Sequence, residues 1–174
     1  MNDIAGNAED RGNARPPTLL ALPSYLAGHV SRIGHRTLVA DLTEHGLRLP
    51  HFAVLSGLHD LGSLTQNELA DRLGLNRSHL VGYLDDLERK GLVSRTRDLA
   101  DRRRQLVRLE DAGQRLAADL IDRAHAGETA SLGVLSAAEL ATLTDLLRRV
   151  VTADDAAQAC AAAEKHPEKH AEKR

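Results

Sequence analysis

The stretch that decides the fold is residues 64–113, which runs LTQNELADRLGLNRSHLVGYLDDLERKGLVSRTRDLADRRRQLVRLEDAG. It opens with a capping box, Thr65-Gln66-Asn67-Glu68, which predicts a short helix ending at Gly74. Asn76 is a favourable N-cap for a second helix, and Gly91 ends that helix. Two short helices joined by a glycine turn predict a helix-turn-helix.

The two predicted helices share an apolar seam and leave a polar face open. The seam residues recur at helical spacing and are Leu69, Leu73, Leu80, Leu84 and Leu87. The start of the second helix instead carries Arg77, Ser78, His79, Gly82 and Tyr83. Arg or His can hydrogen-bond guanine, Ser can bond bases or phosphates, and a helix N-terminus favours phosphate. This face is therefore predicted to contact duplex DNA.

A predicted β-hairpin follows, with strands at 92–97 and 104–109. Its polar tip contains three consecutive arginines, Arg102 to Arg104, and a two-stranded ribbon is narrow enough to enter a minor groove. Asp101 can pair with a neighbouring arginine and fix its direction. An internal salt bridge that only stiffens the hairpin is an equally good interpretation of Asp101.

Positive charge is concentrated in the same region. The whole chain of 174 residues has a formal net charge of −2. Residues 76–108 contain nine basic and five acidic side chains, a local charge of +4, so the rest of the chain is −6. A cationic patch on an acidic body suits a protein that binds phosphates at one site.

The flanking sequence predicts more helices. The chain has 30 Leu and 26 Ala but one Phe and no Trp, which favours aliphatic helix packing over a β-sandwich. The expected helices are Pro23 to Gly46, Pro50 to Gly62, Asp111 to Ala130, and Ser136 to Val151, the last opened by a second capping box, Ser136-x-x-Glu139. Residues 1–17 are expected to form a disordered leader, and residues 153–174 a C-terminal tail.

The chain resembles the MarR family of winged helix-turn-helix regulators over about residues 18–152. The marks of the resemblance are ELADRLG, LERKGLV, the D-x-x-D-R-R pattern of residues 98–103, and Gly113 after the second strand. The resemblance implies a mainly α fold with six helices and a β-hairpin wing. It also implies dimerisation through N- and C-terminal helices, here residues 22–45 and 111–152.

The resemblance further implies an obligate homodimer that binds a pseudo-palindromic double-stranded operator and acts as a repressor released by a small-molecule effector. It makes Asp101 and Arg103 the wing pair, with Arg103 in the minor groove. The predicted DNA contacts are Gln66, Asn76, Arg77, Ser78, His79, Tyr83, Arg95, Arg97, Asp101, Arg102 and Arg103. The effector is expected near Arg32, His35, His51 and His59.

Other functions fit the sequence less well. The chain has no phosphate-binding glycine loop, nucleophile motif or run of metal ligands, so we expect neither an enzyme nor a cofactor. A zinc-responsive repressor of the same fold is one alternative, because Glu44-His45 lies in an interhelical turn, but the helix after the wing offers only His125 as a partner. A helical dimer that binds a small molecule or protein, and not DNA, is another. The single cysteine, Cys160, has no neighbours in sequence that would make it a thiol sensor.

The expected location is the cytoplasm. The sequence contains no apolar run of 18 residues, which argues against a membrane span. Its first residues, Met1-Asn2-Asp3-Ile4, have neither the basic start nor the apolar stretch of a secretory signal.

Overall fold

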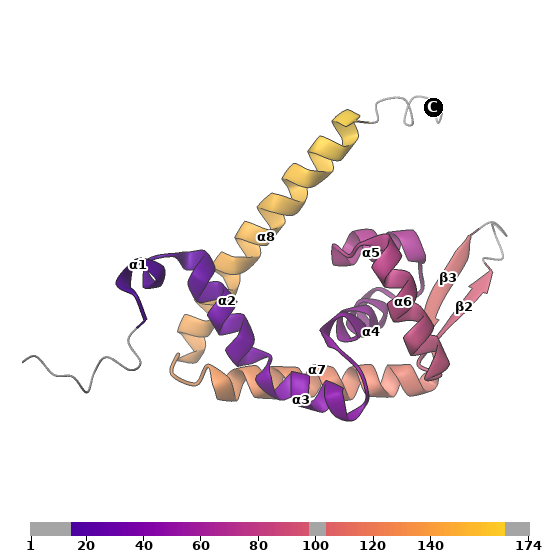
Figure 1. Ribbon diagram of the computed structural model, residues 1–174, viewed down its shortest axis with the longest axis horizontal. Coiled ribbons are helices and arrows are strands. Elements are labelled where there is room, and N and C mark those ends of the chain that lie inside the picture. Colours follow the sequence, from indigo (N-terminus) through magenta and orange to yellow (C-terminus); the bar gives the residue numbers. More distant parts are fainter. Residues whose placement is uncertain (1–14, 98–103, 166–174) are drawn as a thin grey trace, which may run out of the picture. The chain divides into compact units, whose positions relative to one another are not determined.

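Helices make up most of the chain in the computed structural model, which describes residues 15–97 and 104–165 (Figure 1). The chain divides into two units between Ser131 and Leu132. In chain order the first unit contains α1 (Pro17–Leu20), α2 (Pro23–Gly34), α3 (Arg36–Glu44), α4 (Leu49–Leu61), β1 (Leu64–Thr65), α5 (Gln66–Leu73), α6 (Arg77–Arg89), β2 (Val93–Arg97), β3 (Gln105–Leu109) and α7 (Asp111–Ser131). The second unit contains α8 (Ala137–Lys165).

The core of the first unit is aliphatic and centres on α4, α5 and α6. Leu69, Leu80, Leu84 and Leu87, four of the five predicted seam residues, are completely buried, and Leu73 packs against them half-buried. Leucines alternate with polar residues at helical spacing on α6, so one face is buried and the other is left for solvent. The predicted seam is confirmed.

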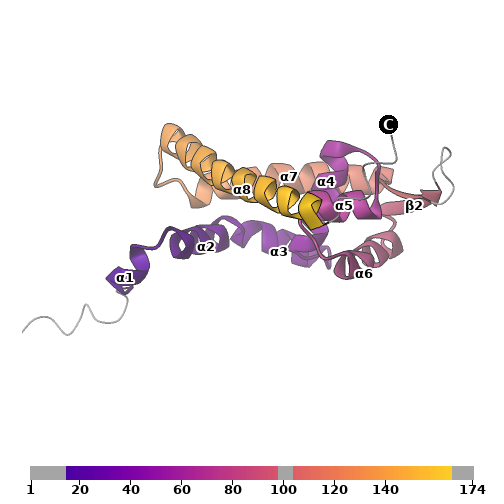
Figure 2. The ribbon, with the colours of Figure 1, turned by 90° about the horizontal axis from the view of Figure 1, so that it is seen from above.

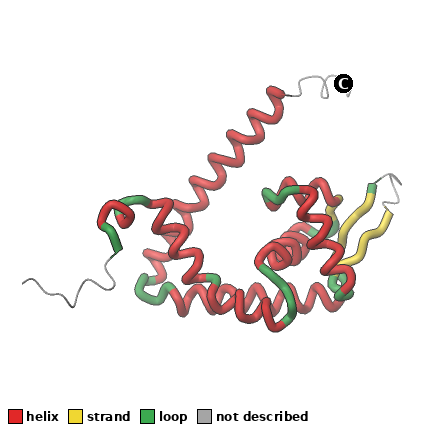
Figure 3. Tube along the Cα trace, in the orientation of Figure 1, coloured by secondary structure: helices red, strands yellow, loops and turns green. Residues whose placement is uncertain are grey.

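The strands, yellow in Figure 3, form a small sheet. It is antiparallel, and its strand order is β1-β3-β2. The β2–β3 hairpin pairs Val93 with Leu109 and Arg97 with Gln105. The predicted hairpin is therefore confirmed. Strand β1 was not predicted from the sequence; it adds two residues, Leu64 and Thr65, to the free edge of β3. Its pairing fixes the start of α5 against the sheet.

Helix α7 contacts α2, α3 and α4 along its length, and Figure 2 shows α2 and α3 following one another alongside it. Small residues on α7 permit this packing. Gly127 is buried, and a Cβ there would lie 3.1 Å from the Cβ of Thr37 in α3. The first turn of α7 meets the base of the wing in the same way, through Gly113. Thus one long helix supports both the N-terminal helices and the winged segment.

Three expected boundaries were wrong. The helix expected from Pro23 to Gly46 is interrupted at His35, next to the buried Gly34, which a glutamate side chain of α7 approaches closely. The helix expected to end at Val151 continues to Lys165, because the alanine-rich sequence favours helix, so residues 153–165 are helical. Helix α1 begins at Pro17, inside the expected leader, while residues 1–14 lie outside the described residues.

Candidate nucleic-acid interface

The helix-turn-helix is fixed by caps at both of its helices. The Thr65 hydroxyl accepts the Glu68 N–H at 3.3 Å, and the Glu68 carboxylate accepts the Thr65 N–H at 2.9 Å, as the capping box predicts. Asn76 Oδ1 accepts the Ser78 N–H at 2.9 Å and caps α6. Between the helices, Gly74 adopts a φ of 60°, a left-handed conformation that glycine adopts without strain. These local interactions set where α6 begins.

The first turns of α6 present polar side chains to solvent. Arg77, Ser78 and His79 are all exposed, while Tyr83, one turn further on, is half-buried. The first turn contains no acidic residue, so the N-terminal end of the helix dipole is not neutralised there. The Arg77 guanidinium donates to Asp71 at 3.0 Å, but both side chains are more than 60% exposed. Such an exposed pair is weak, and Arg77 can exchange Asp71 for a phosphate or a base.

The hairpin supplies further arginines beside α6. Arg97 is exposed at the end of β2. Arg104, just before β3, donates to Glu68 of α5 at 2.7 Å and so links the wing to the helix-turn-helix. Glu68 has a lowered pKa, first because Thr65 hydrogen-bonds its carboxylate and then because of Arg104. Gln66 is half-buried at the start of α5.

The predicted wing-tip residues Asp101, Arg102 and Arg103 lie outside the described residues. Their DNA contacts stay predictions.

Arg95 has a different environment from the one predicted. Its side chain is only 20% exposed, and its guanidinium donates to Asp85 at 2.6 Å and to Glu88 at 3.0 Å through Nε. These hydrogen bonds, first those with Glu88, raise the pKa of Arg95, and they lower the pKa of Glu88. Arg95 thus joins β2 to α6 and neutralises two carboxylates on α6. Its predicted contact with DNA stays untested.

The third carboxylate of α6 is also neutralised within the chain. Asp86 accepts a hydrogen bond from Arg89 at 3.0 Å and lies 3.4 Å from the buried His51 ring. The hydrogen bond from Arg89 is the main reason that the pKa of Asp86 is lowered. The C-terminal half of α6 therefore does not present unpaired negative charge, which would repel a phosphate backbone.

A cavity of about 390 Å³ lies between α3, α4 and α7. Its lining residues are Gly34, His35, Leu38, Phe52, Ser56, Asp60, Ile121, Ala124, His125 and Glu128. The Ser56 hydroxyl is buried and has no hydrogen-bond partner among the residues that the structure describes. A mixed lining of this kind, with an unsatisfied hydroxyl, suits a small organic ligand. The spacing of Phe52, Ser56 and Asp60, four residues apart on α4, was the sequence signal that could have located this cavity.

Of the four residues predicted to surround an effector, His35 lines this cavity. Arg32 instead donates to His29 at 2.8 Å on the same helix. His59 is hydrogen-bonded to Gln114 of α7 at 2.9 Å. His51 lies between α4 and α6. The structure therefore does not bring the four predicted residues together.

Within residues 15–97 and 104–165, no three His, Cys, Asp or Glu side chains are grouped as metal ligands. Among the described helices, none combines the length and the apolar character that a membrane span needs.

Comparisons with known proteins agree on one family. The MarR family model matches residues 47–113. The HTH-type transcriptional regulator YfiV of Bacillus subtilis is 30% identical over 101 residues, which is 58% of this chain and 63% of that protein. The match therefore spans less than two thirds of that relative.

Solved structures are similar over more of the chain. The PcaV transcriptional regulator from Streptomyces coelicolor, crystallised in complex with its natural ligand, is 32% identical with a TM-score of 0.65, over 82% of this chain and 99% of that one. Wild-type MarR from E. coli, in its apo form, is 26% identical with a TM-score of 0.63, over 79% of this chain and 98% of that one. Together with the helix-turn-helix and its β-hairpin wing, these similarities show that the chain belongs to the MarR family of transcriptional regulators.

Proposed function

We propose that this protein is a dimeric transcriptional repressor that binds a specific double-stranded DNA sequence in the cytoplasm and is released by a small-molecule effector. The observation that carries the proposal is the exposed N-terminal half of α6, where Arg77, Ser78 and His79 stand clear of the core. In a helix-turn-helix protein this part of the second helix enters the major groove. Membership of the MarR family supports the same use of α6.

DNA recognition divides between α6 and its surroundings. Arg77 and His79 are placed to hydrogen-bond base edges, while Ser78 and the helix N-terminus are placed to bind phosphate. Gln66 and Asn76, at the starts of α5 and α6, belong to the same end of the motif. We infer that the exposed Arg97 contacts the phosphate backbone of the bound DNA. The wing tip, with Asp101, Arg102 and Arg103, is proposed to contact the minor groove.

Dimerisation is proposed through the apolar side chains of the terminal helices. Leu20, Leu22 and Leu26 are exposed at the N-terminal end. In α8, large exposed apolar residues include Leu146, Leu147, Val150 and Val151. Apolar side chains that recur on one helix and remain in water favour burial against a second copy. A two-fold dimer would present two α6 helices to successive major grooves about 10 base pairs apart.

Release by an effector is proposed to start from the cavity between α3, α4 and α7. Phe52 and Ser56 on α4 line the cavity, and α4 also packs against α5 and α6. A ligand that binds one arrangement of these helices more tightly than the other increases the population of the arrangement that it binds. Occupation of the cavity would therefore change the orientation of α6 and with it the affinity for DNA.

Selection of duplexes from a random-sequence pool tests this function directly. We expect the protein to enrich an inverted repeat with half-sites about 10 base pairs apart, and to elute as a dimer in light-scattering chromatography. Affinity for the enriched duplex should fall steeply with salt, because each neutralised phosphate contributes about −0.9 to the slope of log K against log salt. If no sequence is enriched although the protein elutes as a folded dimer, the result would favour a helical dimer that binds a small molecule or a protein and does not bind DNA.

A further inference from the structure

Helix α4 begins with an unusual cap. In an ordinary capping box, Ser or Thr at the N-cap is paired with Glu or Gln three residues later. Here these positions hold Arg48 and His51, and the Arg48 backbone N–H donates to His51 Nδ1 at 3.0 Å. The His51 side chain is only 2% exposed. A buried imidazole therefore accepts the N-cap hydrogen bond that a carboxylate or amide usually accepts.

This hydrogen bond fixes the tautomer of His51. A ring nitrogen that accepts a hydrogen bond carries no proton, so the proton of the neutral ring must be on Nε2. Nε2 lies 3.4 Å from Asp86 Oδ2 on α6, which is long for a hydrogen bond, and among the described residues it has no better partner. Because a buried N–H is costly to leave unpaired, the contact with Asp86 is the one that this proton has to satisfy.

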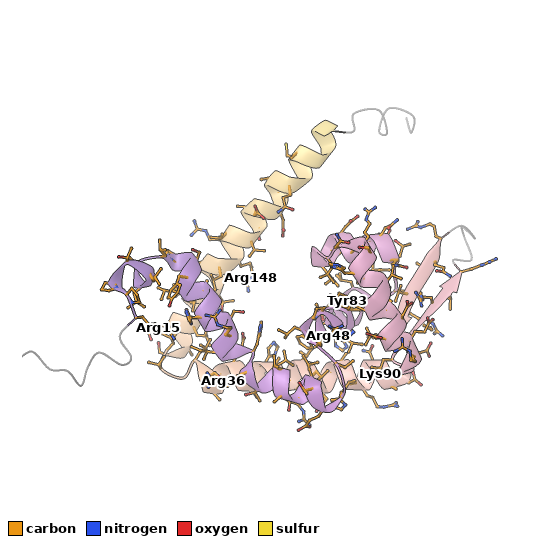
Figure 4. The ribbon with its side chains drawn as sticks, viewed as in Figure 1. Arg15, Arg36, Arg48, Tyr83, Lys90 and Arg148 are labelled. Atoms are coloured by element: carbon orange, nitrogen blue, oxygen red, sulfur yellow. The ribbon has the colours of Figure 1, made fainter. Side chains whose placement is uncertain are left out.

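The same turn of α4 holds α6 through Tyr83. The His51 and Tyr83 rings meet edge to face, with centroids 5.3 Å apart and planes at 83°. The Arg48 guanidinium carbon lies 5.9 Å from the centroid of the Tyr83 ring, and Figure 4 shows the two side chains close together. Tyr83 and Asp86 are one turn apart on α6, so they present one flank of that helix to α4. Arg95 holds the opposite flank through Asp85 and Glu88.

A second proton on His51 would disrupt this arrangement. It would have to sit on Nδ1, where it would point at the Arg48 N–H and break the cap of α4. Burial is the main cause that lowers the pKa of His51, and the positive charges of Arg48 and Lys90 lower it further, while Asp86 acts in the opposite direction. Arg89 competes for the same Asp86 carboxylate. The folded protein therefore holds His51 in its neutral form at neutral pH.

We propose that His51 is the positioning residue that fixes the recognition helix α6 against α4, and that only its neutral form, with the proton on Nε2, does so. The inference rests on the proposed function, because α6 is the helix that contacts DNA there. Because the pKa of His51 is lowered from the ordinary 6.5 of histidine, it predicts that DNA affinity falls only at a pH below 6.5, where His51 takes up a proton.

A His51→Gln variant distinguishes the effect of protonating His51 from the effect of protonating the other eight histidines. Glutamine is a standard capping-box residue whose carbonyl can accept the Arg48 N–H, and its amide can donate towards Asp86 without titrating. His45→Gln is the matched control, since His45 is exposed in the turn before α4. Affinity for the duplex selected by the wild type is measured by fluorescence anisotropy from pH 7.5 to 5.5.

At pH 7.5 we expect His51→Gln to bind within about threefold of wild type. At lower pH the wild type should weaken relative to His51→Gln, by up to about tenfold for each unit by which the His51 pKa differs between DNA-bound and free protein. His45→Gln should keep the wild-type profile. Parallel profiles for wild type and His51→Gln would overturn the proposal.

Nitrogen-15 NMR of the histidine rings tests the same proposal without DNA. We expect the neutral His51 ring to carry its proton on Nε2 and to titrate below pH 6.5. A proton on Nδ1, or titration above 6.5, would overturn it. If no duplex is selected, the proposed function fails, and the NMR result still decides whether His51 is locked as a neutral cap.

Discussion

Replacing Gly113 with alanine tests how the wing is attached to α7. A Cβ on Gly113 would lie 1.9 Å from the carbonyl oxygen of Leu92 and 2.8 Å from its carbonyl carbon. The same oxygen accepts the Glu110 N–H at 3.0 Å. Both close atoms belong to the backbone, so no side-chain rotation relieves the overlap. The base of the wing must move away from α7.

The size of the effect follows from these contacts. Bringing 1.9 Å to 3.0 Å requires a shift of 1.1 Å. Losing the hydrogen bond to the Leu92 carbonyl costs about 1–3 kcal/mol. Overpacking destabilises by about 1–3 kcal/mol more, and the higher helix propensity of alanine offsets about 1 kcal/mol of this loss. We expect the free energy of unfolding to fall by about 3 kcal/mol.

Urea unfolding followed by circular dichroism at a fixed protein concentration measures this change. The matched control is Gly82→Ala, in the interior of α6, where a new Cβ would meet no atom of residues 15–97 or 104–165 within 4 Å. That substitution should raise the free energy of unfolding by about 1 kcal/mol. The account of the wing attachment is refuted if Gly113→Ala unfolds within about 1 kcal/mol of the wild type.

Three further substitutions test the caps, the ion pairs and the cavity. Thr65→Ala removes the capping box of α5 and should lower the free energy of unfolding, measured in urea, by about 1 kcal/mol. In the control Thr43→Ala, only the hydrogen bond from the hydroxyl to the Val39 carbonyl in the same helix is lost, and the free energy of unfolding should change by less than about 0.5 kcal/mol. Arg95→Ala should destabilise by about 1 kcal/mol at pH 7. Arg95 lowers the pKa of Glu88 below its ordinary 4.5, so the stability difference between wild type and Arg95→Ala should be present above pH 4.5 and vanish as acid protonates Glu88. A stability difference that persists in acid would exclude the ion pair as its cause. Ser56→Ala removes a buried hydroxyl that has no partner in the described part of the chain, and it should raise the thermal midpoint. A lower midpoint would show that the hydroxyl is satisfied.

Features governed by local sequence could be predicted. Thr65, Asn76 and Ser136 cap their helices as expected, because an N-cap needs only the side chain and the next few amides. The leucine spacing of α5 and α6 predicted which faces are buried, since helical periodicity fixes which side chains share a face. The helix-turn-helix and its wing followed from these local signals.

Features that depend on partners distant in sequence could not be predicted. In the sequence, Arg95 cannot be distinguished from an arginine of the hairpin that faces DNA. Only the packing of β2 against α6 brings it to Asp85 and Glu88. His51 is likewise indistinguishable from an effector ligand until α4 is placed beside α6. The length of α8 is a different case, because the alanine-rich sequence after Val151 already favoured a longer helix.

The most direct test of the central claim, that the N-terminal half of α6 contacts DNA, compares Arg77→Ala with Arg123→Ala. Both arginines are more than half exposed, but Arg123 lies on α7, where it pairs with Asp119 and, at 3.6 Å, with Asp41 of α3. Affinity for the selected duplex is measured by anisotropy at several salt concentrations. Arg77→Ala should weaken binding by about 1–3 kcal/mol, while Arg123→Ala should match the wild type. Equal affinities for the wild type and Arg77→Ala would contradict the claim.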